Sequence, residues 1–153
     1  MRVEVRQGEL SEVGADLAVL GLLDGGELPA AAAGAAGADD AKSAFKKLSL
    51  LRPEGFRALL VVGLGEADEL DAEKLRVAAA IAAKEAERLE ATSVAWALPE
   101  TVGAAAATEA LTTGTILAAY RYDRFRSRDL NDSPRLESLV LLAPGELAGA
   151  AEA

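Results

Sequence analysis

The sequence predicts an α/β fold, with three layers and a mixed central sheet of about six strands covered by helices on both faces. The first observation is the apolar run 59–63, which leads through Gly63-Leu-Gly65 into a helix that opens at Asp71. The second is the regular alternation of strand-like and helical segments along the chain. The third is Arg52-Pro-Glu-Gly55, a turn between two strand-like segments. A hairpin embedded among strand–helix–strand crossovers makes the sheet mixed.

The first third of the chain supplies two strands. Val3 and Val5 alternate with charged neighbours, which predicts a half-buried strand. Residues 16–23 are almost continuously apolar, as expected of a central strand, and Asp24-Gly-Gly26 breaks that run. The Ala- and Gly-rich segment 29–38 predicts a short helix or a mobile loop.

Residues 45–51 and 57–64 form the two arms of the predicted hairpin. The helix that follows spans 72–90, with Asp71 as its N-cap and Glu73 favourably placed in its first turn. One apolar stripe at helical spacing is expected to be buried: Leu75, Ala79, Ala82, Ala86 and Leu89. The charged residues Lys84, Glu85, Glu87 and Arg88 lie largely off this stripe.

The last third completes the sheet. Residues 92–98 predict a strand ended by Pro99, with Trp96 in the core, and a second helix spans 104–120. Residues 136–143 predict a final buried strand, closed by Pro144-Gly145. We therefore predict one domain over 1–145, and interpret 146–153 as the start of an Ala-rich linker helix.

Composition excludes several classes of function. The net charge of −9 disfavours binding to nucleic acid or to an anionic membrane surface. The chain has neither cysteine nor histidine, which excludes disulfides, thiolate catalysis and a Ser–His pair within it. The start of the chain is charged and strand-like rather than a signal peptide, and no apolar run is long enough to span a bilayer. A cytoplasmic protein is expected.

Two short segments invite a functional interpretation. Gly63-Leu-Gly65 after a strand could hold a phosphate, but the third glycine of the dinucleotide motif is missing and Glu66, Asp68 and Glu69 would repel the anion. A plain turn is the preferred interpretation. The arginines of 121–128, interleaved with aromatic residues, could bind single-stranded nucleic acid. We favour aromatic packing at a helix end with solvated arginines, and interpret 128–134 as a polar loop.

In their order and spacing, three segments resemble the N-terminal domain of the leucyl (cytosol) aminopeptidases. These are Leu59 to Gly65, the helix start Glu73-Lys-Leu-Arg76, and Gly114 to Phe125. The resemblance runs from the first strand to about Pro144 and implies a macro-domain-like fold. It also implies a separate catalytic domain that uses two divalent metals, zinc or manganese, to release N-terminal residues from peptides.

The resemblance further implies a homo-hexamer in which this domain contacts its own catalytic domain and neighbouring subunits. None of the family's catalytic motifs can be placed on this sequence. We therefore assign no catalytic, cofactor-binding or metal-binding residue, and whether the chain belongs to an enzyme rests on the resemblance alone. A structural or assembly role is expected.

The alternative is a stand-alone macro-type module that binds ADP-ribose or a related nucleotide. Asp16, the apolar strand and Asp24-Gly-Gly26 have the layout of such modules. However, Gly21-Leu-Leu-Asp24 stands where those modules place Asn-Ala-Ala-Asn, so an acidic residue replaces the ribose-binding asparagine. A scaffold domain that only docks to partners is the third interpretation.

Overall fold

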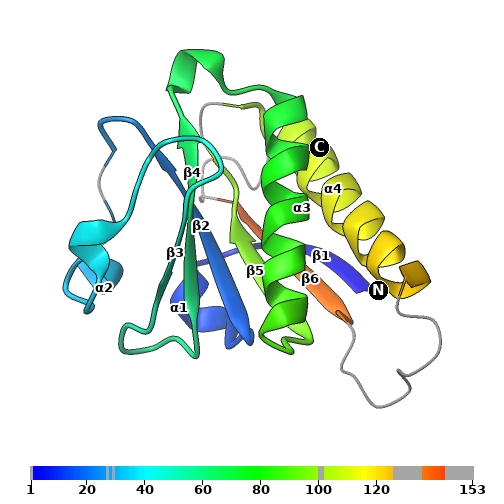
Figure 1. Cartoon of the computed structure of the whole chain (residues 1–153), viewed down its shortest axis with the longest axis horizontal. Coiled ribbons are helices and arrows are strands. Elements are labelled where there is room, and N and C mark those ends of the chain that lie inside the picture. Colours follow the sequence, from blue (N-terminus) through cyan, green and yellow to red (C-terminus); the bar gives the residue numbers. More distant parts are fainter. Residues whose placement is uncertain (1, 27, 29, 100–101, 126–135, 144–153) are drawn as a thin grey trace.

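The computed structural model describes residues 2–26, 28, 30–99, 102–125 and 136–143, except for the side chains of 11, 30, 31, 40 and 120–125. Its sheet has the strand order β1-β6-β5-β2-β4-β3 (Figure 1). The strands are β1 (Arg2–Gln7), β2 (Leu17–Leu23), β3 (Leu48–Leu51), β4 (Leu59–Gly65), β5 (Ser93–Ala97) and β6 (Ser138–Ala143). The helices are α1 (Leu10–Val13), α2 (Ala30–Ala33), α3 (Ala72–Arg88) and α4 (Ala104–Phe125), with short 3₁₀ turns at Ala38–Asp40 and Ala67–Glu69.

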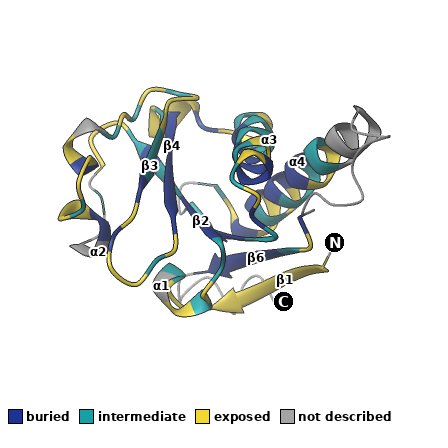
Figure 2. Cartoon of the chain, turned by 60° about the horizontal axis from the view of Figure 1, so that its bottom comes forward, coloured by how far each residue is buried: buried dark blue, intermediate teal, exposed yellow. Residues whose placement is uncertain are grey.

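The sheet is mixed, as predicted. Strands β3 and β4 form an antiparallel hairpin, whereas every other neighbouring pair in the sheet is parallel. The long helices α3 and α4 lie side by side on one face, and the single-turn helices α1 and α2 lie on the other (Figures 1 and 2). The predicted three-layer α/β fold is therefore confirmed, although one helical layer is much thinner than the other.

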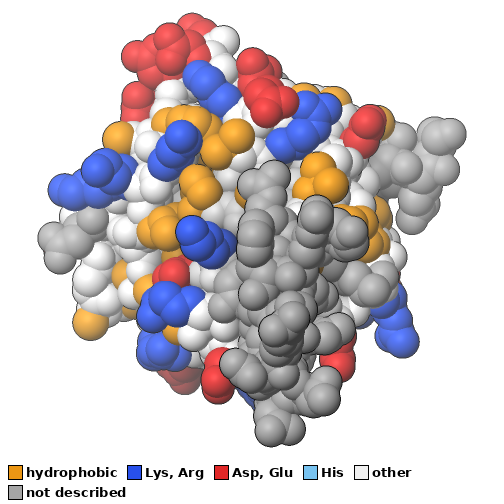
Figure 3. Space-filling view, turned by 45° about the vertical axis from the view of Figure 1, so that its right-hand side comes forward, with side chains coloured by type: hydrophobic (Ala, Val, Ile, Leu, Met, Phe, Trp, Pro, Cys, Tyr) orange, Lys and Arg blue, Asp and Glu red, His pale blue; other side chains and the backbone are white. Residues whose placement is uncertain are grey.

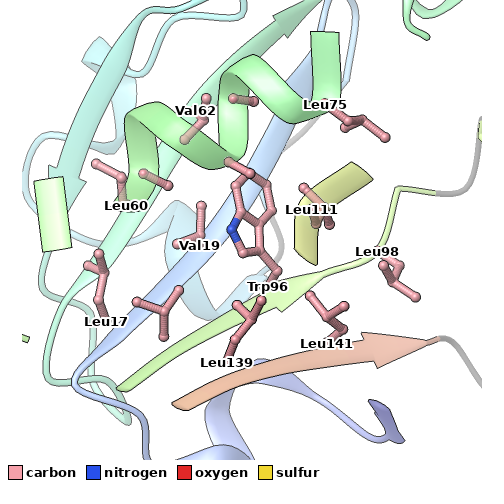
Figure 4. Close-up of a cluster of buried hydrophobic side chains, with 14 of the residues drawn as sticks. Leu17, Val19, Leu60, Val62, Leu75, Trp96, Leu98, Leu111, Leu139 and Leu141 are labelled. Atoms are coloured by element: carbon pink, nitrogen blue, oxygen red, sulfur yellow. The ribbon is translucent and has the colours of Figure 1, made fainter. Parts of the chain in front are cut away.

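The main core lies between the sheet and the α3–α4 pair (Figure 4). Trp96 on β5 is the largest fully buried side chain of this core, as its mid-strand position predicted. Leucines and valines of β2, β4 and β6 surround it, together with Leu75 of α3 and Leu111 of α4. Two smaller apolar clusters lie under α1 and α2 on the opposite face.

Helix α3 begins and ends with defined caps. Asp71 is the N-cap, as predicted, and its Oδ1 accepts a hydrogen bond from the Lys74 N–H at 2.9 Å. At the other end Glu90 has a left-handed φ of 60°, and Ala91 donates its N–H to the Ala86 carbonyl at 2.8 Å. This is a Schellman closure with glutamate where glycine is usual. The helix therefore ends at Arg88, two residues before the predicted end at Glu90.

The buried face of α3 is wider than the predicted stripe. Leu75, Ala79, Ala82 and Ala86 are fully buried as expected. Leu89 was expected to be buried but is only partly so, because the chain turns away immediately after it. Glu87 was placed off the stripe but is only 8% exposed. It follows Ala83 by one turn, on a second edge that is buried because α3 packs against both the sheet and α4.

Other boundaries also differ from the prediction. Strand β3 begins at Leu48 rather than Phe45, because the preceding residues leave the ladder through a left-handed Lys46 with a φ of 72°. Helix α4 continues to Phe125, beyond the predicted end at Tyr120. Helix α1 was not predicted. Segment 29–38 contains a short helix, α2, in agreement with one of its two interpretations.

Strand β1 was predicted to be half-buried, but every residue in it is exposed. It lies at the edge of the sheet, and neither α3 nor α4 covers it (Figure 2). The alternation of valine and charged residues reports correctly which side chains share a face. It carries no information on whether that face is covered.

Replacement of Leu75 by alanine should lower the free energy of unfolding by about 2–5 kcal/mol, because the side chain is fully buried between α3 and the sheet. Lys84→Ala on the exposed face of the same helix is the matched control and should change it by less than about 0.5 kcal/mol. Urea denaturation followed by circular dichroism measures both. Equal losses for the two variants would contradict the packing described for α3.

Candidate functional site

In α/β sheets, ligands bind beyond the carboxyl ends of the parallel strands, so that edge is the first place to look for a site. Here it carries Asp24-Gly-Gly26, which follows β2, and Gly65, which ends β4. The segment 43–47 crosses the same edge before β3 begins. We call this segment the strap. These three segments include both the macro-like loop and the glycine pair recognised in the sequence.

Four backbone amides at this edge are already hydrogen-bonded within the protein. Gly63 donates its N–H to the Lys47 carbonyl and Gly65 donates to the Ser43 carbonyl, each at 2.8 Å. Asp24 donates to the Gly65 carbonyl and Gly26 to the Leu23 carbonyl, each at 2.9 Å. A phosphate cradle requires free N–H groups that converge on the anion. These four amides are not available for that purpose.

Gly63 is explained by the strap. A Cβ atom on Gly63 would lie 2.0 Å from the Ala44 carbonyl oxygen, so only glycine allows the strap to lie on β4. Gly63 therefore belongs to the strand, in agreement with the predicted strand 57–64, and the interpretation of Gly63-Leu-Gly65 as a plain turn does not hold for this residue. Gly65 does occupy a turn conformation, with a φ of 78°. The sequence contains no signal for the strap contact, because it depends on the tertiary approach of two segments.

The carboxylate of Asp24 faces the strap. Its Oδ1 accepts a hydrogen bond from the Ser43 hydroxyl, which ties the loop after β2 to the strap. At this position a macro-type module would approach an anionic pyrophosphate. A carboxylate there repels such a ligand at short range. The polar groups described at this edge form hydrogen bonds between the loop after β2, the strap and the end of β4.

The amino edge of the sheet carries a second polar cluster, centred on Asp16. Its Oδ2 accepts hydrogen bonds from the Thr92 N–H at 2.9 Å and from the Thr92 hydroxyl at 3.0 Å. Its Oδ1 accepts one from Arg57 at 2.7 Å, and its own N–H donates to the Ser93 hydroxyl at 2.8 Å. The cluster joins the beginnings of β2 and β5 to the segment before β4.

Hydrogen bonds from Thr92 hold the pKa of the Asp16 carboxyl below its ordinary value, assisted by the charge of Arg57 and opposed by partial burial. The Arg57 side chain is 75% exposed, so the ion pair itself contributes little to stability. The bonds from Thr92 are the stronger part of the cluster. A groove of about 290 Å³ beside it is lined by Asp16, Glu90, Arg52 and Arg57, with Ala58, Leu89 and Ala91, so acidic and basic groups balance there.

Neither cluster contains a histidine or a cysteine, since the sequence has none. Within the described ranges, no group of three or more carboxylate, histidine or cysteine side chains is placed to hold a metal ion. No helix in the part of the chain that the structure describes is long and apolar enough to cross a bilayer. The arginine and aromatic side chains of 120–128, the loop 128–134 and the tail 146–153 lie outside the described residues.

Comparison with known proteins identifies the family. The model of the cytosol aminopeptidase family, N-terminal domain, matches residues 30–129, about two thirds of the chain. A probable cytosol aminopeptidase of Roseiflexus castenholzii is 34% identical over 94% of this chain and 31% of its own length. A second one, from Microcystis aeruginosa, is 36% identical over 61% of this chain and 19% of its own length.

Three solved structures share the fold of this chain. A mutant of tomato leucine aminopeptidase is 20% identical, with a TM-score of 0.73 over 99% of this chain and 35% of its own, which supports the fold alone. The bottromycin maturation enzyme BotP is 26% identical, with a TM-score of 0.66 over 83% of this chain and 27% of its own. The same enzyme in complex with Mn has a TM-score of 0.65 at 25% identity, covering 91% of this chain and 30% of its own.

The mixed six-stranded α/β fold and the extent of the match define an aminopeptidase N-terminal domain. The chain belongs to the cytosol aminopeptidase family and contains that family's N-terminal domain. It spans about a third or less of the length of the curated relatives that it matches. The resemblance found in the sequence is thereby confirmed.

The Asp16 cluster makes a prediction about pH. Because the folded-state pKa of Asp16 is lowered, its contribution to stability is present above the unfolded pKa of about 4 and is lost as the pH falls through the folded value. Asp16→Asn should therefore reduce the free energy of unfolding by about 1–3 kcal/mol at pH 7, and by less at pH 3. Urea denaturation at both pH values measures the difference.

Asp68→Asn is the control, because Asp68 is exposed in the turn between β4 and α3. It should change stability by less than about 0.5 kcal/mol at either pH. A loss for Asp16→Asn that is the same at pH 7 and pH 3 would show that the carboxylate charge is not what Thr92 and Arg57 stabilise.

Proposed function

We propose that this chain serves as the non-catalytic N-terminal domain of a metal-dependent aminopeptidase, with a structural or assembly role. The observation that carries the proposal is the closed carboxyl edge of the sheet. The amides of Gly63, Gly65, Asp24 and Gly26 are bonded within the chain, and the strap lies over Gly63. A fold that has closed its usual ligand edge is suited to docking rather than to binding a nucleotide.

The chemistry of the whole protein would then lie in a separate catalytic domain. There, two divalent metals, zinc or manganese, would release N-terminal residues such as leucine from peptides. The complex of BotP with Mn is consistent with a metal-dependent reaction in the family. This domain, over 1–145, would contact its own catalytic domain through a linker that begins at 146–153. It would also contact neighbouring subunits of a homo-hexamer in the cytoplasm, in keeping with relatives named cytosol aminopeptidases.

A chimaera tests this role directly. The matching segment of the Roseiflexus castenholzii protein, 31% of its length, is replaced by this chain. We expect the chimaera to form the same oligomer as the parent and to release p-nitroaniline from leucine p-nitroanilide in the presence of manganese or zinc. A soluble chimaera that stays monomeric and inactive, beside an active parent, would contradict the assembly role.

The 153-residue chain alone is the matching negative control. It has no histidine or cysteine, and we assign it no metal-binding residue. With manganese, zinc or cobalt it should not hydrolyse leucine p-nitroanilide above background. Turnover that copurifies with the chain and disappears with a chelator would show that it carries a catalytic site of its own.

Nucleotide binding by a macro-type module remains the alternative to be tested. Calorimetric titration with ADP-ribose should show no binding at micromolar concentrations, because the edge amides are used and Asp24 would face the pyrophosphate. Saturable binding that is lost in Gly26→Val would favour the nucleotide-binding module. Gly34→Val, at an exposed glycine with no atom near its Cβ position, controls for the added side chain.

A further inference from the structure

Strand β1 leaves one backbone edge unpaired by any other strand of the described sheet. Its only strand neighbour there is β6, and Arg2 donates its N–H to the Glu137 carbonyl on that side at 2.8 Å. Because successive residues of a strand direct their backbone groups to opposite sides, Arg2, Glu4 and Arg6 bond towards β6. The N–H and C=O groups of Val3, Val5 and Gln7 therefore point to the open edge, where another strand can pair with them.

The same strand carries exposed apolar side chains. In the sheet register Val3 lies beside Leu139 and Val5 beside Leu141, both of which belong to the core under α3 and α4. The valines therefore share the face that α4 covers, but α4 does not reach them. A groove of about 400 Å³ separates Val5 from the threonine-rich side of α4.

Most of the exposed large hydrophobic side chains of the described residues lie on the two elements that border this groove. There are five in total, and four lie on β1 or α4: Val3 (37% exposed), Val5 (40%), Ile116 (42%) and Leu117 (56%). Figure 3 looks at the molecule from the α4 side and shows hydrophobic side chains between the charged ones there. Such a concentration beside an open strand edge is typical of an interaction surface.

The opposite face of β1 carries alternating charges. Arg2, Glu4 and Arg6 are all exposed, and Glu4 accepts a hydrogen bond from Arg6 of its own strand at 3.0 Å. An edge with charges of one sign would repel another copy of itself. An edge with alternating charges attracts a second copy whenever the register places arginine opposite glutamate.

We propose that β1 is an interface between two copies of this chain, which pair through antiparallel β1 strands about a two-fold axis at Val5. Val5 lies opposite Val5 of the second copy and Val3 lies opposite Gln7, so the groups on the open edge exchange hydrogen bonds. Glu4 lies opposite Arg6 on both sides of the axis. The register with Glu4 opposite Glu4 would instead place Arg2 opposite Arg6, and repulsion excludes it.

The paired strands join the two sheets into one and bring the valines of both copies together beside α4. This inference deepens the assembly role proposed above by naming one surface for it, and the pairing itself depends only on β1. The chimaera can fail through any of its contacts between domains or subunits. The experiments below use the 153-residue chain alone, so their failure is distinguishable from a failure of the proposed function.

Sedimentation equilibrium at about 0.15 M salt, with the chain at up to about 0.1 mM, measures the association; we expect a monomer–dimer equilibrium in this range. Glu4→Arg should weaken it by roughly tenfold, because two attractive cross-strand pairs become repulsive. Glu4→Arg combined with Arg6→Glu restores opposite charges in the proposed register and should restore the dimer. In a register with Val3 opposite Val3, the double variant would place Arg2 opposite the new arginine, so no rescue is expected there.

Cysteine variants test the register independently, since the chain has no cysteine of its own. Under mild oxidation Val5→Cys should form a cross-linked dimer, because directly opposed residues have Cα atoms about 5.5 Å apart. Val3→Cys is the matched control and should form little cross-link, because it faces Gln7. Val5→Pro removes an edge N–H without touching the β6 pairing, so circular dichroism should report an intact fold while the dimer is lost.

A monomer throughout this concentration range would overturn the proposal. So would a dimer that forms equally well with Val5→Pro, or one whose charge variants show no rescue. Cross-linking of Val3→Cys in preference to Val5→Cys would overturn the register and with it the proposed pairing.

Discussion

The close approach of α3 to α4 is the constraint on which the architecture depends. A Cβ atom on Gly114 would lie 2.4 Å from the Arg76 carbonyl oxygen and 2.9 Å from the Cβ of Ala79, so the two backbones nearly touch. The alanines along the buried face of α3 serve the same end. Because the helices contribute little volume, the strands must fill the core, and Trp96 supplies its largest side chain. The alanine-rich face of α3 is thereby buried against the sheet and α4.

Local signals made most of the fold predictable. The N-cap at Asp71, the hairpin of β3 and β4 and the apolar strands each depend on a few neighbouring residues, and the structure confirms them. The turn of the hairpin lies one residue later than the predicted 52–55, because Phe56 donates its N–H to the Pro53 carbonyl at 3.2 Å. The errors lie where distant segments meet. Strand β3 begins later than predicted because the strap, which contains the left-handed Lys46, lies on Gly63 of β4. Glu87 was expected to be exposed and is buried because α3 packs against both the sheet and α4. The exposure of β1 depends on how far α4 extends over the sheet, which no periodicity within β1 can report.

The polar clusters were harder to predict than the fold. Asp16 and Asp24 were recognised as a macro-like layout, but their partners, Thr92, Arg57 and Ser43, come from remote parts of the sequence. The sequence did show which catalytic side chains are missing: the chain has no histidine and no cysteine. In the structure, Asp24 binds the strap through Ser43, and Asp16 joins the beginnings of β2 and β5 to the segment before β4.

The pairing of β1 with β6 has a consequence for the order in which the protein folds. Arg2 aligns with Ser138, so this parallel pair joins segments that are separated by nearly the whole sequence. The β3–β4 hairpin and the adjacent helices α3 and α4 need far shorter loops, whose closure costs less entropy. During synthesis the first strand therefore waits for the sixth before it can join the sheet. Until then the backbone edge of β1 that pairs with β6 in the folded chain is open as well, so both edges of the strand are free to pair with other chains.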